Sequence, residues 1–329
     1  MSDLRWVVRR VDMKTNTNAV LTTLVLAAVG CHSSQAQKGT PTVSTAQTKT
    51  GHLAVNGVNY YYEIHGTGEP LLLLHGGLGS IDMFCPGLAK FAETRQVIAV
   101  DLHGHGRTDL GDRAINLSDQ GDDLAVILDK LGYKQVDALG YSMGAAIAFR
   151  LAVQHPQSVR RLVLVSPAFS RDGFYPEMLP MQAQVSAAAL PMMKNTPMYQ
   201  GYVKVAPHPE QFGKLLDRMG ELMRRPYDWS EDLKRLGANG TPTLLVWGDS
   251  DMMRTEHMID AYKLIGGGQQ DAGWQREHMS KNRLAILPNR THYEMAMAPE
   301  LVPTVLPFLD GNTGGPNSQN QVASADAKK

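Results

Sequence analysis

Six short apolar runs alternate with helical patterns along most of this chain, and this alternation constrains the fold more than any other feature. Each run has the length of a buried strand and is bounded by polar or turn residues. Helical patterns stand between several runs, for example from a capping Ser118 to a terminating Gly132. The alternation predicts an α/β protein with a mostly parallel central sheet flanked by helices. The runs are PLLLLHG (70–76), QVIAVDL (96–102), QVDALGY (135–141), RLVLVSP (161–167), TPTLLVWG (241–248) and RLAILPN (283–289).

The first strands of the chain are expected to form an antiparallel hairpin. The segments HLAV (52–55) and VNYYYEIH (58–65) flank Asn56-Gly57, a pair that favours a tight primed turn. The folded domain is therefore expected to begin near Gly51, with antiparallel strands added at one edge of the parallel sheet.

Composition indicates an ordinary globular domain between two low-complexity ends. Hydrophobic residues make up 43% of the chain and charged residues 19%, which is enough apolar material for a sizeable core. Lys plus Arg and Asp plus Glu number 32 each, so no charge excess predicts a nucleic-acid partner. Residues 37–50 predict a disordered linker and residues 311–329 a disordered tail, because both are small and polar. The folded domain is expected over residues 51–310.

The N-terminal segment 1–36 has the pattern of an export signal. Basic residues precede an apolar run over 19–30, which is too short to span a bilayer as a helix. Cys31 follows Ala-Val-Gly, a sequence similar to a bacterial lipoprotein box, and this predicts lipidation of Cys31. Ordinary cleavage after Ser-Gln-Ala (34–36) is the alternative. The basic residues are Arg5, Arg9, Arg10 and Lys14.

The two predicted ways of processing the signal, lipidation and plain cleavage, imply two different locations of the protein. Lipidation predicts a periplasmic or outer-membrane-anchored lipoprotein, attached to the membrane through Cys31. Plain cleavage predicts a secreted protein. The signal fits translation from Met1 as well as from Met13, since Met13-Lys14 makes a conventional start.

Two segments interrupt the alternation of strands and helices. Residues 168 to about 239 carry no strand pattern and are rich in methionine, so we expect a helical cap over the carboxyl ends of the strands. Methionines on such a cap either line an adaptable apolar pocket or pack the cap onto the core. The connection Gly266–Lys281 is the second interruption, and its Trp274 either reaches the site or anchors the loop. The cap methionines are Met178, Met181, Met192, Met193, Met198, Met219 and Met223.

A Gly-x-Ser-x-Gly motif stands at the junction of an expected strand and an expected helix. It reads GYSMG over 140–144, after VDALGY and before MGAAIAFRLAVQ. A sharp strand-to-helix turn lifts the serine hydroxyl above the sheet edge, and flanking glycines let neighbouring segments pack close to it. The helix N-terminus favours a negative charge that develops at the same place. Ser142 is therefore the predicted nucleophile.

A hydroxyl nucleophile needs a base, and His292 is the histidine in the right place. It stands in LPNRTHYEM, shortly after the last expected strand, so it projects from the sheet edge that carries Ser142. His257 and His278 lie in helical patterns and are expected at the surface. His155 closes the helix that follows the nucleophile and is expected to cap it.

The base in turn needs an anion that fixes its tautomer. Asp249 and Asp251 both follow the strand LLVWG, and either can reach the histidine. We favour Asp251, because the loop has cleared the strand at that position. The chain order Ser142, Asp251, His292 differs from the orders of chymotrypsin and subtilisin.

Acyl transfer also needs amide donors for an oxyanion. Met143, the residue after the nucleophile, supplies one backbone N–H. The glycine-rich segment HGGLGS (75–80) follows the first parallel strand and supplies the other, from Gly77 or alternatively from Leu78. His75 is expected to hydrogen bond loop backbone and to have no catalytic role.

These motifs occur together and in order, and over residues 51–310 the chain resembles the α/β-hydrolase superfamily. The resemblance implies an α/β-hydrolase fold with a helical cap. It implies that DLHGHGRTD forms a structural turn, so Asp101, His103 and His105 are structural and not metal ligands. It implies neither a metal nor an organic cofactor. The motifs are HGGLGS (75–80), DLHGHGRTD (101–109), GYSMGA (140–145), WGDSD (247–251) and NRTHYE (289–294).

Departures from related families narrow the activity. Dehalogenases and epoxide hydrolases of this fold carry Asp where this chain has Ser142. Proline iminopeptidases usually have Pro at the position of Leu78 and Trp at that of Met143. Ring-cleavage C–C hydrolases usually have Asn at the position of Tyr141. What remains is similar to serine carboxylesterases and lactonases.

The predicted function is cleavage of a small-molecule ester or lactone that has apolar area, by two-step acyl transfer. An amidase, a C–C bond hydrolase or a peracid-forming enzyme on the same triad is the alternative. A non-catalytic binding protein on this fold is a further alternative, which the presence of all three triad residue types disfavours.

Overall fold

The computed structural model describes residues 48–311. The export signal, the lipidation of Cys31 and all but the last residues of the linker 37–50 lie outside the described residues, as does the tail from 312 onward. Within the described residues the first strand begins at Lys49, two residues before the expected start at Gly51.

No helix between residues 48 and 311 is both long enough and apolar enough to cross a membrane.

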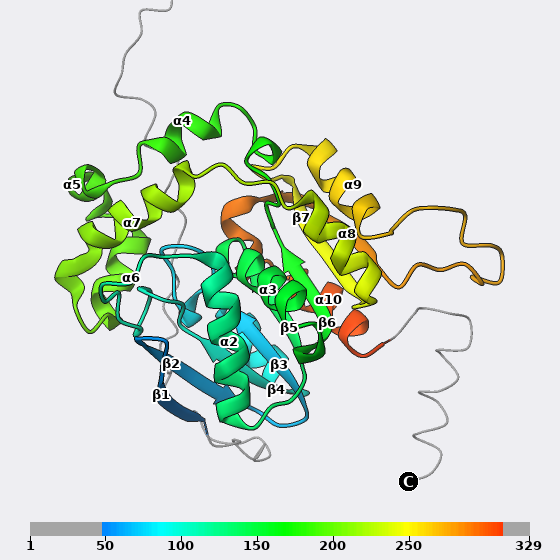
Figure 1. Cartoon of the computed structure of the whole chain (residues 1–329), viewed down its shortest axis with the longest axis horizontal. Coiled ribbons are helices and arrows are strands. Elements are labelled where there is room, and N and C mark those ends of the chain that lie inside the picture. The colour runs from blue at the N-terminus through cyan, green and yellow to red at the C-terminus, as the bar shows by residue number, and fades with distance from the viewer. Residues whose placement is uncertain (1–47, 312–329) are drawn as a thin grey trace, which may run out of the picture.

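A single eight-stranded sheet organises the molecule (Figure 1). The strand order is β1-β2-β4-β3-β5-β6-β7-β8. The strands β1 and β2 are antiparallel to their neighbours and the other pairs are parallel, which confirms the predicted α/β fold class with its antiparallel edge. Each of the six apolar runs overlaps one of the parallel strands. The strands are β1 (Lys49–Val55), β2 (Val58–His65), β3 (Glu69–Leu74), β4 (Arg95–Val100), β5 (Val136–Tyr141), β6 (Val159–Val165), β7 (Thr243–Ser250) and β8 (Arg283–Thr291).

The hairpin turn between β1 and β2 has the geometry that its sequence predicts. Asn56 and Gly57 both adopt left-handed backbone conformations, with φ of 48° and 80°. A type I′ turn requires positive φ at both central residues, and its twist matches that of the flanking strands.

Helices cover both faces of the sheet and enclose two apolar cores. Side chains alternate between the faces, so Leu71 and Leu73 of β3 lie in one core while Leu72 and Leu74 lie in the other. The helices α2 (Leu117–Leu131), α3 (Met143–Gln154), α8 (Ser230–Asn239) and α9 (Thr255–Leu264) cover one face, and α1 (Gly87–Ala92) and α10 (Leu301–Leu309) cover the other.

The helix α2 ends where the sequence predicts but is capped by a different residue. Asn116, not Ser118, is the N-cap, and its side chain accepts hydrogen bonds from the backbone N–H groups of Ser118 and Asp119 at 2.9 and 3.3 Å. Ser118 is already inside the first turn. Gly132 ends the helix in a left-handed conformation, with φ of 87°.

A cap made of short helices is inserted between β6 and α8. It contains η3 (Arg171–Gly173), α4 (Met178–Ala183), η4 (Ala187–Ala189), α5 (Leu190–Met193), α6 (Pro197–Val205), η5 (Pro209–Gln211) and α7 (Phe212–Arg224). Figure 1 shows α4, α5, α6 and α7 grouped on one side of the molecule. The two ends of the insertion are joined, because Arg171 donates a backbone hydrogen bond to Tyr227 at 3.0 Å.

The cap is shorter than the predicted range 168–239. The helix α8 packs with its buried Leu233 and Leu236 into the same core as α3, so it belongs to the layer that covers the sheet. An apolar helical stripe at this position does not reveal whether it faces the core or the cap.

The loop between α9 and β8 projects from the body of the molecule (Figure 1). Its Trp274 is 95% exposed. Trp274 therefore neither reaches the site nor anchors the loop by burial.

Candidate active site

Ser142 occupies the sharp turn between β5 and α3. Its φ of 52° and ψ of −114° are strained for a residue with a side chain. The turn requires glycine at both flanking positions, since a Cβ at Gly140 would overlap the carbonyl group of Gly144, and a Cβ at Gly144 would overlap the carbonyl oxygen of Leu74. The motif therefore sets the serine in the position that a nucleophile elbow requires.

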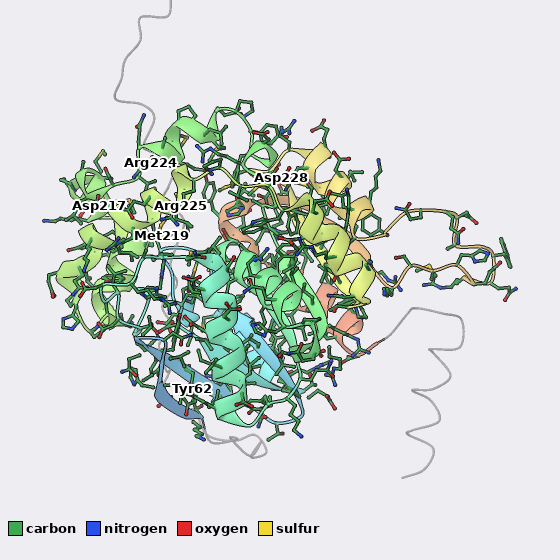
Figure 2. All side chains as sticks on the ribbon, viewed as in Figure 1. Tyr62, Asp217, Met219, Arg224, Arg225 and Asp228 are labelled. Atoms are coloured by element: carbon green, nitrogen blue, oxygen red, sulfur yellow. The ribbon has the colours of Figure 1, made fainter. Side chains whose placement is uncertain are left out.

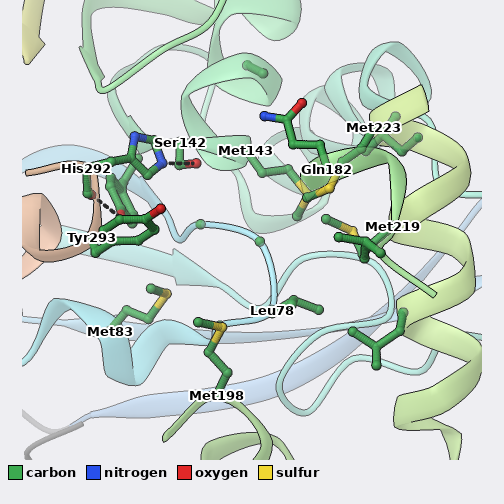
Figure 3. Close-up of a pocket in the computed structure, with 18 of the residues that line it drawn as sticks. Leu78, Met83, Ser142, Met143, Gln182, Met198, Met219, Met223, His292 and Tyr293 are labelled. Carbon is green, nitrogen blue, oxygen red and sulfur yellow. Dashed lines mark hydrogen bonds between the residues drawn. The ribbon is translucent and has the colours of Figure 1, made fainter. Parts of the chain in front are cut away.

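The structure brings the three predicted catalytic residues into one hydrogen-bonded relay. The Oγ of Ser142 lies 2.9 Å from Nε2 of His292, and Nδ1 of His292 lies 2.8 Å from Oδ1 of Asp251. Figure 3 shows the first of these bonds. Asp251 and His292 are 5% and 6% exposed, so the ion pair that would form on proton transfer is shielded from water.

Ser166 holds the second oxygen of the carboxylate. It follows β6 directly, has φ of 51°, and donates a hydrogen bond from Oγ to Oδ2 of Asp251 at 2.5 Å. Burial alone would raise the pKa of Asp251, but His292 and Ser166 outweigh it and keep this pKa below its ordinary value. Ser166 is not among the site residues predicted from the sequence. One feature of the sequence could have identified it: Ser166 directly follows β6, the strand beside β5, which carries the nucleophile.

Asp249, the alternative acid, faces away from the relay. Its carboxylate is exposed and accepts backbone hydrogen bonds from Asn289 at 2.9 Å and from Arg290 at 3.3 Å. It fastens the end of β8 to β7. The structure therefore places Asp251, and not Asp249, beside His292.

The backbone of His292 is fixed from two sides. The phenol of Tyr141 donates a hydrogen bond to the carbonyl oxygen of His292 at 2.6 Å. His292 begins η6 (His292–Met297), which carries a capping box made by Thr291 and Glu294. Tyr141 thus has a positioning role beside the nucleophile.

The glycine-rich loop lies against the nucleophile turn, as an oxyanion site requires. A Cβ at Gly77 would contact the Cβ of Met143 at 3.9 Å, so the two proposed donors are neighbours. Met143 is the first residue of α3, and its N–H has no acceptor within the helix. The N–H of Gly77 donates to no backbone acceptor among residues 48–311. Leu78, the alternative, has a left-handed φ of 57°.

The histidines of the segments HGGLGS (75–80) and DLHGHGRTD (101–109) are buried and hydrogen bond loop backbone. His75 is fully buried, with Nδ1 2.7 Å from the carbonyl oxygen of Gly76 and Nε2 accepting from the N–H of Leu102 at 3.0 Å. His103 and His105 are also fully buried and contact the carbonyl oxygens of other loop residues at 2.8 and 2.9 Å.

Asp101 organises the turn that these histidines support. Its carboxylate accepts hydrogen bonds from the backbone N–H groups of Ile81 and Arg107, both at 2.8 Å. Among residues 48–311 no group of three or more His, Cys, Asp or Glu side chains is arranged to hold a metal ion.

His257 is not the surface residue that its helical pattern suggested. It accepts a hydrogen bond at Nε2 from the backbone N–H of Phe169 at 3.1 Å, and its ring packs against Gly173 at the base of the cap. His278 is exposed, as expected. His257 therefore joins the cap to the core. Its Nε2 is already occupied by the N–H of Phe169, so it does not act as a surface base.

The buried histidines predict a loss of stability in mild acid. Burial lowers the pKa of His75 to about 4 and that of His105 to about 3. Between these values and about 6.5, the ordinary value, the unfolded chain binds protons that the folded chain does not, so lowering the pH favours unfolding. We expect the free energy of unfolding in urea to fall by about 1.4 kcal/mol per pH unit for each such histidine below about pH 6.5.

His105→Asn tests this expectation, because the amide can keep the hydrogen bond that Nδ1 makes with the carbonyl oxygen of His103. The variant should show a flatter pH dependence than the wild type, and the exposed His278→Asn should not. An equal slope in His105→Asn and wild type would contradict the assignment.

A cavity of about 1370 Å³ opens over Ser142 and His292. This volume is larger than that of common small-molecule sites, which is about 300–1,000 Å³. All seven cap methionines named from the sequence line it, so they form a pocket wall. Its charged lining residues are Asp82, Arg107, Lys204 and Arg225. The methionines of the lining are Met83, Met143, Met178, Met181, Met192, Met193, Met198, Met219, Met223, Met252, Met253 and Met297.

Comparison with known proteins agrees with the fold that the sheet topology indicates. A family model described as "alpha/beta hydrolase fold" matches residues 69–200. The protein RutD of Azorhizobium caulinodans, which its name describes as a carbamate hydrolase, is similar at 32% identity over 149 residues, 45% of this chain and 52% of that protein. The chain spans about half the length of the first curated relatives it matches, at 52%, 56% and 44%.

Two further likenesses cover most of the chain. The (E)-2-((N-methylformamido)methylene)succinate hydrolase of Acinetobacter baylyi is 25% identical, over 78% of this chain and 95% of that protein. The crystal structure of carboxylesterase CesB from Bacillus subtilis superposes with a TM-score of 0.60 at 20% identity, over 80% of this chain and 92% of that one. The sheet topology, the match of the family model to residues 69–200 and these likenesses together show that the chain has the α/β-hydrolase fold.

Proposed function

We propose that this protein is a serine hydrolase that cleaves carboxylic esters, lactones included, through an acyl-enzyme. The observation that carries the proposal is the relay of Ser142, His292 and Asp251 at the wall of a large apolar cavity. The relay supplies a nucleophile and a base, and the cavity supplies the apolar contacts that a neutral ester needs.

Acylation begins when Ser142 Oγ attacks the ester carbonyl carbon. His292 Nε2 accepts the hydroxyl proton as the new C–O bond forms, and the negative charge moves onto the former carbonyl oxygen. The backbone N–H groups of Gly77 and Met143 stabilise that oxyanion. His292 then gives the proton to the leaving alcohol, and the ester C–O bond breaks.

Deacylation repeats these steps with water. His292 takes a proton from the water that attacks the acyl-enzyme, and returns it to Ser142 Oγ as the acid leaves. Asp251 accepts the Nδ1–H bond throughout, which keeps Nε2 free of its proton at the start of each half-reaction. At the end of the cycle Ser142 again carries its hydroxyl proton, and Nε2 of His292 is again unprotonated.

A second candidate is amide or carbamate cleavage on the same relay. The names of two relatives, a carbamate hydrolase and a succinate hydrolase with an N-methylformamido group, favour it. C–C bond cleavage has weaker support, because Tyr141 stands where ring-cleavage hydrolases usually have Asn.

A panel of p-nitrophenyl esters of increasing acyl length, run beside matched p-nitroanilides, tests the proposal. We expect ester turnover, with kcat/KM rising from acetate to longer acyl chains because the cavity is apolar. Turnover confined to anilides would support the second candidate and reject ester hydrolysis. A Ser142 that fails to react with a fluorophosphonate would reject both.

A further inference from the structure

We propose that Met219 of the cap helix α7 is the residue that sets the size of the acyl group, within an acyl subsite between Met143 and α7. The inference rests on the proposed ester hydrolysis and assigns a part of the cavity to one half of the substrate. It implies a preference for esters of medium or long unbranched acids over esters of acids branched next to the carbonyl.

The relay fixes which half of an ester lies on which side of Ser142. The leaving alcohol takes its proton from Nε2 of His292, so the alcohol must lie beside His292. The acyl substituent therefore extends away from His292. Figure 3 shows His292 on one side of Ser142 and Met143, Met219 and Met223 on the other. The acyl half consequently lies among these methionines.

Met219 narrows this subsite beside Gly77. Its terminal methyl lies 3.0 Å from the place that a Cβ on Gly77 would occupy, and the Sδ of Met143 lies 3.9 Å from the same place. Met219 is 2% exposed although it belongs to the cap. Because Gly77 is a proposed oxyanion donor, the first carbons of the acyl chain must pass this methyl group.

The helix that carries Met219 is held to the rest of the cap by contacts with residues 183–187. Asp217 accepts a hydrogen bond from the backbone N–H of Ala187 at 2.7 Å. Arg224 donates to the carbonyl oxygen of Ala183 at 3.1 Å, and a Cβ on Gly220 would overlap the carbonyl oxygen of Val185.

These fastenings lie on a different face of α7 from the site-facing methionines. Asp217, Gly220 and Arg224 are three and four residues apart and share a face, whereas Met219 and Met223 share another. Figure 2 labels Asp217, Met219 and Arg224 on the cap side of the molecule. A change at Met219 should therefore alter the subsite while the contacts that place α7 remain.

Two ester series measured on Met219→Ala and Met219→Phe test the proposal. The first series varies the acid from acetate to hexanoate and to the branched 2-methylpropanoate and pivalate, with one alcohol. The second varies the alcohol with acetate held constant. We expect Met219→Ala to raise the ratio of kcat/KM for branched over unbranched acids by about tenfold or more, and Met219→Phe to lower it. The order within the alcohol series should stay as in wild type.

Controls separate size selection from damage. Met258→Ala is the matched control, because Met258 on α9 is 2% exposed, as Met219 is, but does not line the cavity. It should leave both series unchanged. Met219→Leu, which conserves most of the volume, should fold if Met219→Ala does not, and should shift the acyl ratio in the direction of Met219→Ala.

The outcomes are distinct. An unchanged acyl ratio in folded Met219 variants that still turn over esters would overturn the subsite assignment. A shift confined to the alcohol series would overturn it as well, by placing Met219 on the leaving-group side. Absence of ester turnover in the wild type would instead reject the proposed function.

Discussion

Ser142→Ala is expected to lower kcat for ester substrates by about 10⁴- to 10⁶-fold, since removal of the nucleophile abolishes the acyl-enzyme route. The remaining rate would come from binding and from the oxyanion donors acting on water. The fold should survive, because Ser142 caps no helix through its side chain and its hydroxyl bonds to His292. Initial rates with a p-nitrophenyl ester, beside thermal unfolding, measure both effects.

Ser118→Ala is a suitable control for that experiment. Ser118 lines the same cavity but lies in the first turn of α2, away from the relay. Its rate should stay within a factor of a few of wild type. If Ser142→Ala retained more than about a hundredth of the wild-type rate, the nucleophilic role would be untenable, because removal of a triad serine costs about 10⁴-fold or more in kcat.

The sequence was sufficient for the parts of the site that local rules determine. Ser142 could be recognised because a Gly-x-Ser-x-Gly motif between a strand and a helix is typical of a nucleophile elbow. His292 was recognisable because it follows the last parallel strand, and parallel strands deliver the residues that follow them to one edge of the sheet. The same rule also applies to Ser166, which follows β6 and whose hydroxyl donates a hydrogen bond to Asp251.

Other features depend on packing that no local pattern encodes. The boundary of the cap could not be read, because the apolar stripe of α8 fits a core helix as well as a cap helix. His257 was misplaced for a similar reason, since the residues that bury it come from the cap base around Gly173. That all seven cap methionines face one cavity likewise follows from how α4, α5, α6 and α7 are arranged in space.

The choice between Asp249 and Asp251 shows where the sequence was informative but incomplete. The strand β7 continues through Ser250, which pairs with Thr291 across a local irregularity after Gly248. Asp249 is therefore still part of the sheet edge and bonds to β8. Asp251 is the first acid beyond the strand. The motif WGDSD favours Asp251 on this ground, but the length of β7 is visible only in the structure.

Asp251→Asn is expected to lower kcat by about 10⁴-fold with little change in KM. The reason is the direction of two hydrogen bonds. Ser166 donates to one carboxylate oxygen, so in the variant the amide oxygen would take that place and the amide NH₂ group would face His292. A donor at that position favours the tautomer with its proton on Nε2, and such an imidazole cannot accept the proton of Ser142.

Asp249→Asn provides the matched comparison, because it makes the same chemical change two residues away. Asp249 accepts backbone hydrogen bonds from Asn289 and Arg290, and an amide oxygen can still accept at least one of them. We expect its kcat to remain within about threefold of wild type, with any loss appearing as a lower unfolding temperature, since an exposed hydrogen bond contributes only about 1 kcal/mol. The reverse result, a large loss of kcat in Asp249→Asn and a small one in Asp251→Asn, would require the β7–η6 edge to rearrange before catalysis. Equal losses in both would mean that the amide changes disturb His292 through the backbone, and the tautomer argument would then fail.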